Sequence, residues 1–551
     1  MNILNEENFL GYLHEINPQY AGIYFPSSNL LSKKRGDKNG VNVGDFIVIE
    51  GKEHGFLARL IETGLHDGCN KTIKSGQDDL QLLGKAELLL IFKISDPGKA
   101  QKTVFAYPPV GSKVYACSDE QIEKYIRRFG NKESIKDTEG DIYAPLGKLV
   151  SGNALCNVSL NALFQRHCAV VGTTGGGKSW TVSKLMEAVI SKTNNRIILF
   201  DATGEYGAIK SKTVVLGEDS YLPYQKLSIN DLFILLRPGG ESQKSILLEA
   251  VRSLKIVRLS GKTGTFKKAY QQRKEYNELY EKHVAEIEDN TCDFDINFLV
   301  PQIKEECVSY FPEGWGAADA KIYDRQASLV NRIVNLINTD VFNRLLGFKN
   351  VLREHISIIN VIENFTEDPQ SKGSILRINL EYVSSLFSAK EITANAIGSY
   401  LLNKAREKDF KESPVILVVD EAHQFMNKGV TDEHFESLPL DAFDLIAKEC
   451  RKYGLFLCLA TQMPRDIPEG TLSQLGSFIV HRLINERDKK VVENAASSAG
   501  KNMLSFLPAL GEGEALLIGV DFPMPLLVKL DKPDNPPVYN TPLLKAITNY
   551  E

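Results

Sequence analysis

Apolar residues in the first 150 positions come in short runs divided by glycine, asparagine, aspartate and proline. Such runs, rich in Val, Ile, Phe and Tyr, predict strands. They are GIYFP (22–26), DFIVIEG (45–51), GFLARLIETG (55–64), AELLLIFKIS (86–95) and TVFAYPPVGSKVYAC (103–117). Short strands at this spacing predict a small antiparallel β-barrel over residues 1–150. We also expect a helix at 120–129 and a polar linker at 130–141.

From about residue 151 the pattern changes to buried-type strands, each followed by a loop and often by a long helix. Strands are expected in 167–172, 196–207, 374–380, 415–423, 454–462 and 477–483, and helices at 179–193 and 389–408. Apolar strands that alternate with helices predict an α/β domain, over 151–530, with a parallel sheet covered on both faces. A mostly helical insertion, about 228–348, separates the second strand from the third.

Two further segments stand apart by composition. The stretch 265–288 is highly charged, which predicts a solvated helix; the alternative is a contact arm for a partner. The tail 531–551 is proline-rich and then apolar, and we expect it to brace a neighbouring subunit.

Composition narrows the class of protein. The 551 residues are 43% hydrophobic and 25% charged, with a net charge of −5, which excludes a disordered, collagenous or disulfide-scaffold protein. Any nucleic-acid binding therefore needs a local basic lining. The eight cysteines form no CxxC pair, and scattered cysteines are typical of a reducing compartment. Without a secretory signal or a long apolar run, the sequence predicts a cytoplasmic protein that does not enter membranes.

The strongest motif is GTTGGGKS (172–179), which matches GxxxxGK[ST] between a predicted strand and a predicted helix. Glycines allow successive backbone N–H groups to face phosphate oxygens, and the helix N-terminus favours negative charge. Lys178 is expected to bridge the β- and γ-phosphates, and the Ser179 hydroxyl to ligate Mg²⁺. The predicted nucleotide-binding residues are Gly172, Thr173, Thr174, Gly175, Gly176, Gly177, Lys178, Ser179 and Trp180.

A second motif, VILVVDEAH (415–423), ends an apolar strand in two acids. Ligands of α/β sheets bind at the carboxyl ends of strands. We expect Asp420 to hold Mg²⁺ and Glu421 to orient and polarise the attacking water. No guanine-reading NKxD stands in the expected place, so the expected nucleotide is ATP.

Other polar residues follow predicted strands. Asp201 and Glu205 serve either the nucleotide or a neighbouring subunit, or else only the turn itself. Gln462 either senses the γ-phosphate and relays its presence, or is a satisfied amide at a strand end.

Two arginines are candidates for charge stabilisation. Arg166 starts the strand that leads to the phosphate loop, and five residues at roughly 3.3 Å each place it about 17 Å from that loop. It could instead reach the γ-phosphate of an adjacent subunit, as arginine fingers do. Arg451, at a helix end before the next strand, could act within its own chain or across an interface. For both, the alternative is a plain surface cation.

Five motifs together resemble the HerA family of hexameric DNA-translocating ATPases, in the FtsK–HerA branch of RecA-like P-loop motors. They are QRHCAVVGTTGGGKS, FDATGEYG, VVDEAHQF, the CRKYG turn before LATQ, and LPALGEGEALLIG (507–519). The resemblance covers most of 151–530, and YPPVGSKVYAC is similar to the family's N-terminal barrel.

The resemblance implies a RecA-like core that forms a homohexamer and threads double-stranded DNA through a basic channel. The family's Walker-type residues match Lys178, Ser179, Asp420 and Glu421, and the resemblance makes Arg166 the finger in trans, with a contribution from Arg451. The family's barrel docks a nuclease in DNA-end resection or, in some bacteria, a nuclease or sirtuin-like NAD-consuming effector in phage defence. Lys210, Lys212 and Arg465 are the candidate DNA contacts. The alternative function is a nucleotide-dependent ring that assembles an effector protein.

Overall fold

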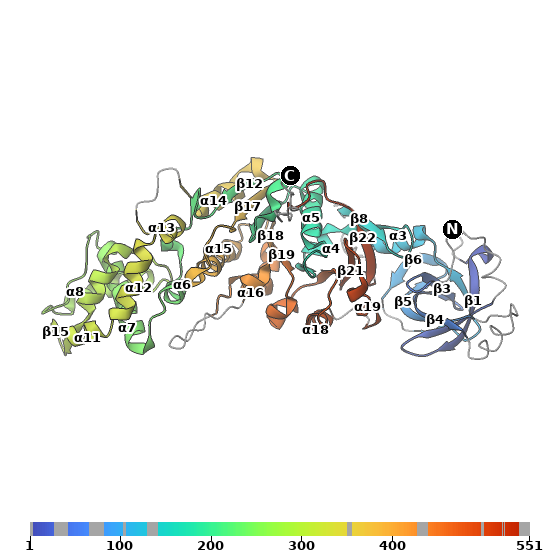
Figure 1. The fold of residues 1–551 in the computed structure, drawn as a ribbon, viewed down its shortest axis with the longest axis horizontal. Coiled ribbons are helices and arrows are strands. Elements are labelled where there is room, and N and C mark those ends of the chain that lie inside the picture. The colour runs from blue at the N-terminus through green and yellow to red at the C-terminus, as the bar shows by residue number, and fades with distance from the viewer. Residues whose placement is uncertain are drawn as a thin grey trace, which may run out of the picture. The chain divides into compact units, whose positions relative to one another are not determined.

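The computed structural model describes residues 4–26, 42–65, 82–102, 106–128, 142–349, 355–426, 439–496, 501–520, 522 and 524–538. The chain forms two compact units (Figure 1). Unit 1 comprises Met1–Thr193, Ala460–Arg465 and Leu472–Pro537, and unit 2 comprises Asn194–Leu459, Asp466–Thr471 and Val538–Glu551. The predicted linker at 130–141 lies outside the described residues, as does the tail beyond residue 538.

Unit 1 begins with the predicted antiparallel barrel. Its strands are β1 (Phe9–Ile16), β2 (Ala21–Phe25), β3 (Phe46–Glu50), β4 (His54–Leu65), β5 (Leu82–Lys93), β6 (Asp96–Gln101) and β7 (Lys113–Ala116). The order β2-β1-β7-β3-β4-β5 closes on itself because β2 also pairs with β5, and β6 adds to β5. Strand β1 was not predicted, although FLGYLHEI alternates buried and exposed positions along part of its length. Helix α3 (Asp119–Arg128) matches the predicted helix.

The rest of unit 1 builds a sheet around the phosphate loop. Strands run in the order β10 (Cys168–Val171), β20 (Ser477–Val480), β21 (Glu514–Gly519), β22 (Leu526–Leu530), β8 (Tyr143–Leu149) and β9 (Leu155–Ser159). Strands β10 and β20 are parallel, and the pairs beyond β20 are antiparallel. The parallel alternation that the sequence predicts therefore ends at β20. Helix α5 (Lys178–Lys192) follows the loop, as predicted.

Unit 2 holds a fully parallel sheet in the order β12 (Lys212–Val215), β17 (Ile375–Asn379), β11 (Arg196–Asp201), β18 (Val415–Val419) and β19 (Leu455–Thr461). The last two residues of β19 belong to unit 1. Every residue of β11, β17 and β18 is buried, as expected for strands covered on both faces. Helices α14 (Ile358–Glu367), α15 (Ala389–Arg406) and α16 (Ala442–Glu449) accompany them.

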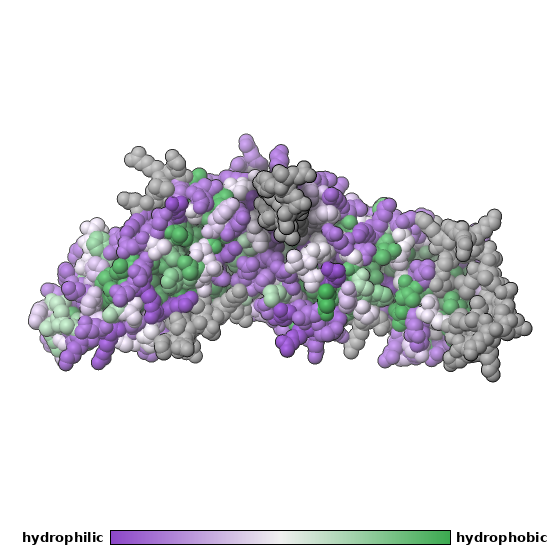
Figure 2. Space-filling model, viewed as in Figure 1, coloured by the Kyte–Doolittle hydropathy of each residue, from purple (hydrophilic) through white to green (hydrophobic). Residues whose placement is uncertain are grey.

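The predicted helical insertion lies in unit 2. It contains α6 (Ile229–Leu236), α7 (Gly240–Leu259), α8 (Lys274–Lys282), α9 (Val284–Ile287), α10 (Leu299–Glu306), α11 (Ala320–Asp324), α12 (Ala327–Asn338) and α13 (Asp340–Leu346). An unpredicted hairpin, β14 (Val308–Phe311) with β15 (Gly314–Ala318), interrupts it. Figure 1 shows α7, α8 and α12 grouped together, and Figure 2 shows a hydrophilic surface over them with interspersed hydrophobic patches.

The charged stretch 265–288 is solvated along most of its length but firmly anchored at one point. Helix α8 buries none of its described residues, as predicted. Lys268, in contrast, is 3% exposed, pairs with Glu306 and lies 4.8 Å from the ring of Tyr276 and 5.0 Å from that of Trp315. A buried cation held by a carboxylate and two rings fixes the start of this stretch to α10 and the hairpin. None of the helices in the described residues is both long enough and apolar enough to cross a membrane.

Candidate nucleotide-binding site

The phosphate loop turns through backbone conformations that favour glycine. Gly175 has φ +75° and Gly177 has φ +103°, and a side chain at either position would be strained. Among the described residues, no side chain caps the N-terminus of α5 at Gly177. The first-turn N–H groups of α5 can therefore serve an anion. Lys178 and Ser179, the next two residues, are 8% and 9% exposed.

His481 and Arg482, which follow β20, pack against this loop and form hydrogen bonds with its backbone. The N–H of His481 donates to the Val171 carbonyl at 2.7 Å, and the Arg482 carbonyl accepts from the Thr173 N–H at 3.0 Å and from its hydroxyl at 3.1 Å. A Cβ added to Gly172 would lie only 2.5 Å from the His481 Cβ. The close approach therefore requires glycine at position 172. Sequence analysis missed His481, because one histidine after an apolar strand carries no signal of its own.

The His481 ring is fully buried and held at both nitrogens. Nδ1 lies 3.0 Å from the Glu514 carbonyl oxygen, and Nε2 lies 2.8 Å from the Thr181 hydroxyl on α5. Burial lowers the pKa of His481 to about 4, and nearby Lys178 acts in the same direction. The ring is therefore neutral near pH 7.

Gln462 lies at the phosphate loop, at the end of β19 as the sequence predicts. The Thr174 hydroxyl donates to the Gln462 amide oxygen at 2.6 Å, and the Gly172 N–H donates to the Thr461 carbonyl at 3.3 Å. The side chain thus contacts the loop, which either of its two interpretations allows.

Helix α5 also holds the beginning of the C-terminal tail. The Lys532 ammonium lies 5.3 Å from the ring centre of Trp180. The Glu187 carboxylate accepts backbone N–H bonds from Asp534 at 2.9 Å and Asn535 at 2.7 Å. The described part of the tail therefore packs on α5 of its own chain.

Arg166 lies at the opposite end of β10 from the phosphate loop. It is partly exposed, and its carbonyl accepts the Gly476 N–H at 2.7 Å. The next residue, His167, is buried with φ +57°, a conformation that L-residues avoid. A strained turn therefore directly follows Arg166.

In unit 2, β18 ends in the two predicted acids. Asp420 is 3% exposed, and its N–H donates to the Phe200 carbonyl at 3.0 Å. Glu421 is 7% exposed and has φ +45° and ψ +46°, and its Oε2 lies 3.2 Å from His423 Nδ1. A buried non-glycine residue in the left-handed region stores strain of the kind found at active sites.

The carboxylate of Asp201 is held by groups of its own loop and by Arg377. Its carboxylate is fully buried and accepts N–H bonds from Thr203, Gly204 and Tyr206, and Arg377 Nε lies 2.7 Å away. These contacts occupy both oxygens with the loop's own groups. Glu205 is partly exposed, and its carbonyl accepts the Val538 N–H at 2.9 Å.

Arg451 is exposed, in a 3-10 turn (Cys450–Tyr453) just before β19, and forms no ion pair with a described carboxylate. Strands β18 and β19 are parallel, with Val415 opposite Leu455 and Val419 opposite Leu459. Arg451 therefore lies at the amino-terminal ends of these strands and Glu421 at their carboxyl ends, with at least about 13 Å of strand between them. That separation excludes a direct contact between them within one chain.

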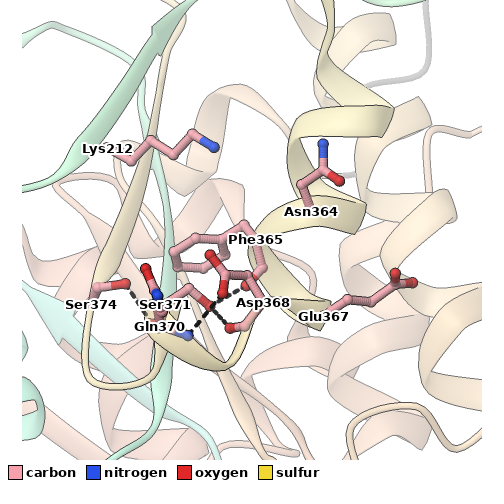
Figure 3. Close-up of a pocket in the computed structure, with 8 residues that line it drawn as sticks. All are labelled: Lys212, Asn364, Phe365, Glu367, Asp368, Gln370, Ser371 and Ser374. Carbon is pink, nitrogen blue, oxygen red and sulfur yellow. Dashed lines mark hydrogen bonds between the residues drawn. The ribbon is translucent and has the colours of Figure 1, made fainter.

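The three candidate DNA contacts differ in what they touch. Arg465 pairs with the buried Asp488 at 2.9 Å, and Lys210 and Lys212 are exposed. Lys212 also lines an open cavity of about 750 Å³, where it extends toward Asn364 on α14 (Figure 3). The other lining residues are Phe365, Glu367, Asp368, Gln370, Ser371 and Ser374.

Two family models match consecutive parts of the chain. "Helicase HerA, central domain" matches residues 144–404, and "Helicase HerA-like C-terminal" matches residues 399–532. The chain is 26% identical over 524 residues to the DNA double-strand break repair helicase HerA of Sulfurisphaera tokodaii, covering 92% of this chain and 90% of that one. It is 25% identical over 517 residues to a probable helicase of Methanocaldococcus jannaschii, covering 90% and 88%.

Among solved structures, VirB4 of Thermoanaerobacter pseudethanolicus aligns with a TM-score of 0.44 at 17% identity, covering 72% of this chain and 98% of that one. The two HerA models together span well over half of the 551 residues. The chain therefore belongs to the HerA helicase family and is a P-loop ATPase whose α/β core follows an N-terminal β-barrel in the sequence.

Proposed function

We propose that this protein is a motor that hydrolyses ATP to move double-stranded DNA through a ring of six copies. The observation that carries the proposal is the phosphate loop, whose left-handed glycines precede an α5 N-terminus with no capping side chain among the described residues. Such a loop binds a triphosphate, and the relatives named for DNA repair supply the link to DNA.

The donor atoms fit Mg²⁺. The Ser179 hydroxyl on the first turn of α5 and the Asp420 carboxylate at the end of β18 are hard oxygen ligands, the kind that this cation prefers. Mg²⁺ bound there would neutralise charge on the phosphate oxygens. Lys178 holds the same oxygens through its ammonium group.

Glu421 is the general base in this proposal. It takes a proton from water as the water oxygen attacks the γ-phosphorus, and ADP leaves. The strained backbone at Glu421 supports the assignment, because such strain persists where a side chain must be aimed. The test is Glu421→Gln, for which we expect ATP binding within about threefold of wild type and turnover lower by roughly a hundredfold or more. Unimpaired DNA-stimulated turnover would refute the assigned base.

Arg166 and Arg451 act on the nucleotide of the adjacent copy in this proposal. Each precedes the amino-terminal end of a strand. Arg166 lies at the end of β10 opposite the phosphate loop, and Arg451 lies before β19, at the end of the sheet opposite Glu421. A guanidinium supplied by a neighbour neutralises charge as it develops in the transition state.

Mixing two inactive variants tests this arrangement. We expect Lys178→Ala and Arg166→Ala to be inactive alone and to recover activity when mixed, because some interfaces then combine an intact Lys178 with an intact Arg166. The same holds for Arg451→Ala, with Lys452→Ala, an exposed neighbour, as the control. Absence of recovery in mixtures that still form rings would show that the arginines act within their own chain.

Lys210 and Lys212 contact DNA phosphates in this proposal, because both are exposed. Arg465 is the weaker candidate, since its guanidinium already pairs with Asp488. Removing a lysine that contacts phosphate should weaken binding equally for all sequences and reduce the salt slope by about one. Lys226→Ala, at another exposed lysine of unit 2, is the matched control.

A nuclease that docks on the barrel and works on broken DNA ends is the proposed partner, in line with the repair names of the relatives. The alternatives are an effector used in phage defence and a ring that only assembles an effector. A motor shows ATP turnover that rises with DNA whether or not the partner is present. An ATP turnover rate in the full complex that is the same with and without DNA would instead favour the assembly role.

A further inference from the structure

His481 connects three parts of the phosphate site that are far apart in the sequence. It follows β20, its ring contacts Thr181 on α5, and its other nitrogen contacts the carbonyl of Glu514, where β21 begins. A Cβ added to Gly176 or to Gly177 would lie 3.4 Å from an atom of His481. The histidine therefore underlies the phosphate loop along most of its length.

The hydrogen-bond partners settle where the ring proton lies. A carbonyl oxygen only accepts, so Nδ1 must carry the proton that it shares with Glu514. In the neutral ring, Nε2 is then an acceptor, and the Thr181 hydroxyl donates to it. The same hydroxyl oxygen lies 3.2 Å from the Gly177 carbonyl, a longer contact than the 2.8 Å to Nε2. The hydroxyl has a single proton, so this contact is not a second hydrogen bond, but the Thr181 N–H donates to the same Gly177 carbonyl at 3.0 Å. Thr181 thus links the histidine to the last glycine of the loop through its own backbone.

We propose that His481 is a positioning residue for nucleotide binding. Its neutral ring orients Thr181 and supports residues 172–177 from beneath, so that the loop holds its phosphate-binding shape before ATP arrives. The side chain itself is fully buried. Its effect is on the affinity for nucleotide and passes through the backbone of the loop, because a binding site that is already ordered loses less entropy when the ligand binds.

Three single variants separate this role from simple packing. Thr181→Val removes the hydroxyl at nearly constant volume, and Thr181→Ser keeps it. His481→Phe fills the cavity but has no ring nitrogen. We expect Thr181→Val and His481→Phe each to raise the Kd for a non-hydrolysable ATP analogue and the KM for ATP about tenfold, with kcat changed less than twofold. Thr181→Ser should stay within about twofold of wild type, as rescue by the retained hydroxyl requires.

The double variant provides the decisive comparison. Because both substitutions remove the same bond, the Thr181→Val, His481→Phe double variant should bind the analogue no more than about twofold more weakly than the weaker single variant. A purely structural role would lower the melting temperature and the fraction of competent sites while leaving Kd and KM unchanged. That result, or single-variant effects that multiply, would overturn the proposal. If His481→Phe fails to fold, the Thr181 pair alone decides, since Thr181→Val binding like Thr181→Ser refutes it.

Discussion

The Thr174 hydroxyl donates a 2.6 Å hydrogen bond to the amide oxygen of Gln462. This bond joins the phosphate loop to the end of β19, two segments separated by 288 residues in the chain. A group that contacts both the loop and the end of a strand is well placed to respond when a γ-phosphate enters.

We predict that Gln462→Leu lowers kcat roughly tenfold to a hundredfold, the effect of losing one hydrogen bond to a charged group. The KM for ATP should change by less than about threefold, because Lys178 and the loop backbone still hold the phosphates. Steady-state hydrolysis measures both. Thr174→Ser, which keeps the hydroxyl, should behave like wild type, and an unchanged kcat in Gln462→Leu would favour the satisfied-amide interpretation.

The strained backbone of Glu421 predicts a conflict between stability and activity. Glycine relieves the left-handed conformation at φ +45°, and alanine does not. Glu421→Gly should therefore be more stable than Glu421→Ala by about 1 kcal/mol, while neither hydrolyses ATP. Thermal unfolding of both variants without nucleotide measures the difference. Equal melting temperatures would show that the loop relaxes without cost.

Removing one member of the Asp201–Arg377 pair should lower the stability of the protein and have little direct effect on ATP hydrolysis. Both side chains are buried, and removing one partner leaves the other charged and unpaired. Asp201→Ala or Arg377→Leu alone should destabilise the protein by roughly 3–5 kcal/mol, and the double variant by less than the two effects combined. Glu205→Gln, at a partly exposed neighbour, should stay within about 0.5 kcal/mol. Chemical denaturation monitored in unit 2 measures each change.

Stability should fall as the pH is lowered from about 6.5, in part because of His481. In the unfolded chain this histidine has a pKa near 6.5 and takes up a proton below that pH, whereas burial keeps the folded ring neutral down to about pH 4. The unfolded state therefore binds more protons between these values, and stability declines toward acid.

From pH 7 to pH 5 this one group removes about 2 kcal/mol. The difference in unfolding free energy between wild type and His481→Phe should shrink by that amount, because all other titrating groups cancel. A difference that stays constant across this range would contradict the assigned neutral ring.

Periodicity and motif spacing predicted most of the fold, because buried parallel strands and amphipathic helices leave clear patterns. Strands β1, β6, β8, β9, β12, β21 and β22 and the β14–β15 hairpin were not predicted. Several of them contain proline or glycine, as in DPGKAQ (β6), YAPLGKL (β8) and GWGAA (β15), and these residues weaken the pattern of a strand. The switch to antiparallel pairing after β20 could not be seen either, because an apolar run does not reveal the direction of its neighbour.

Within the candidate site, motifs supplied the candidate side chains for phosphate and water. They did not predict the residues that support them. Asp201 looked like a candidate ligand because it follows a strand, and only its burial against Arg377 and three N–H groups showed how its oxygens are used. His481 was missed because its role depends on contacts with Thr181 and Glu514, which are distant in sequence.

The support beneath the phosphate loop has a consequence for how the protein is made. Residues 172–179 leave the ribosome some three hundred residues before His481, which supports the loop, and before Glu514, whose carbonyl holds the His481 ring. Until that late stretch emerges, the nascent chain carries a loop without its support. Competence to capture ATP should therefore arise abruptly, once residue 514 has emerged, and a chain truncated before that residue should lack it.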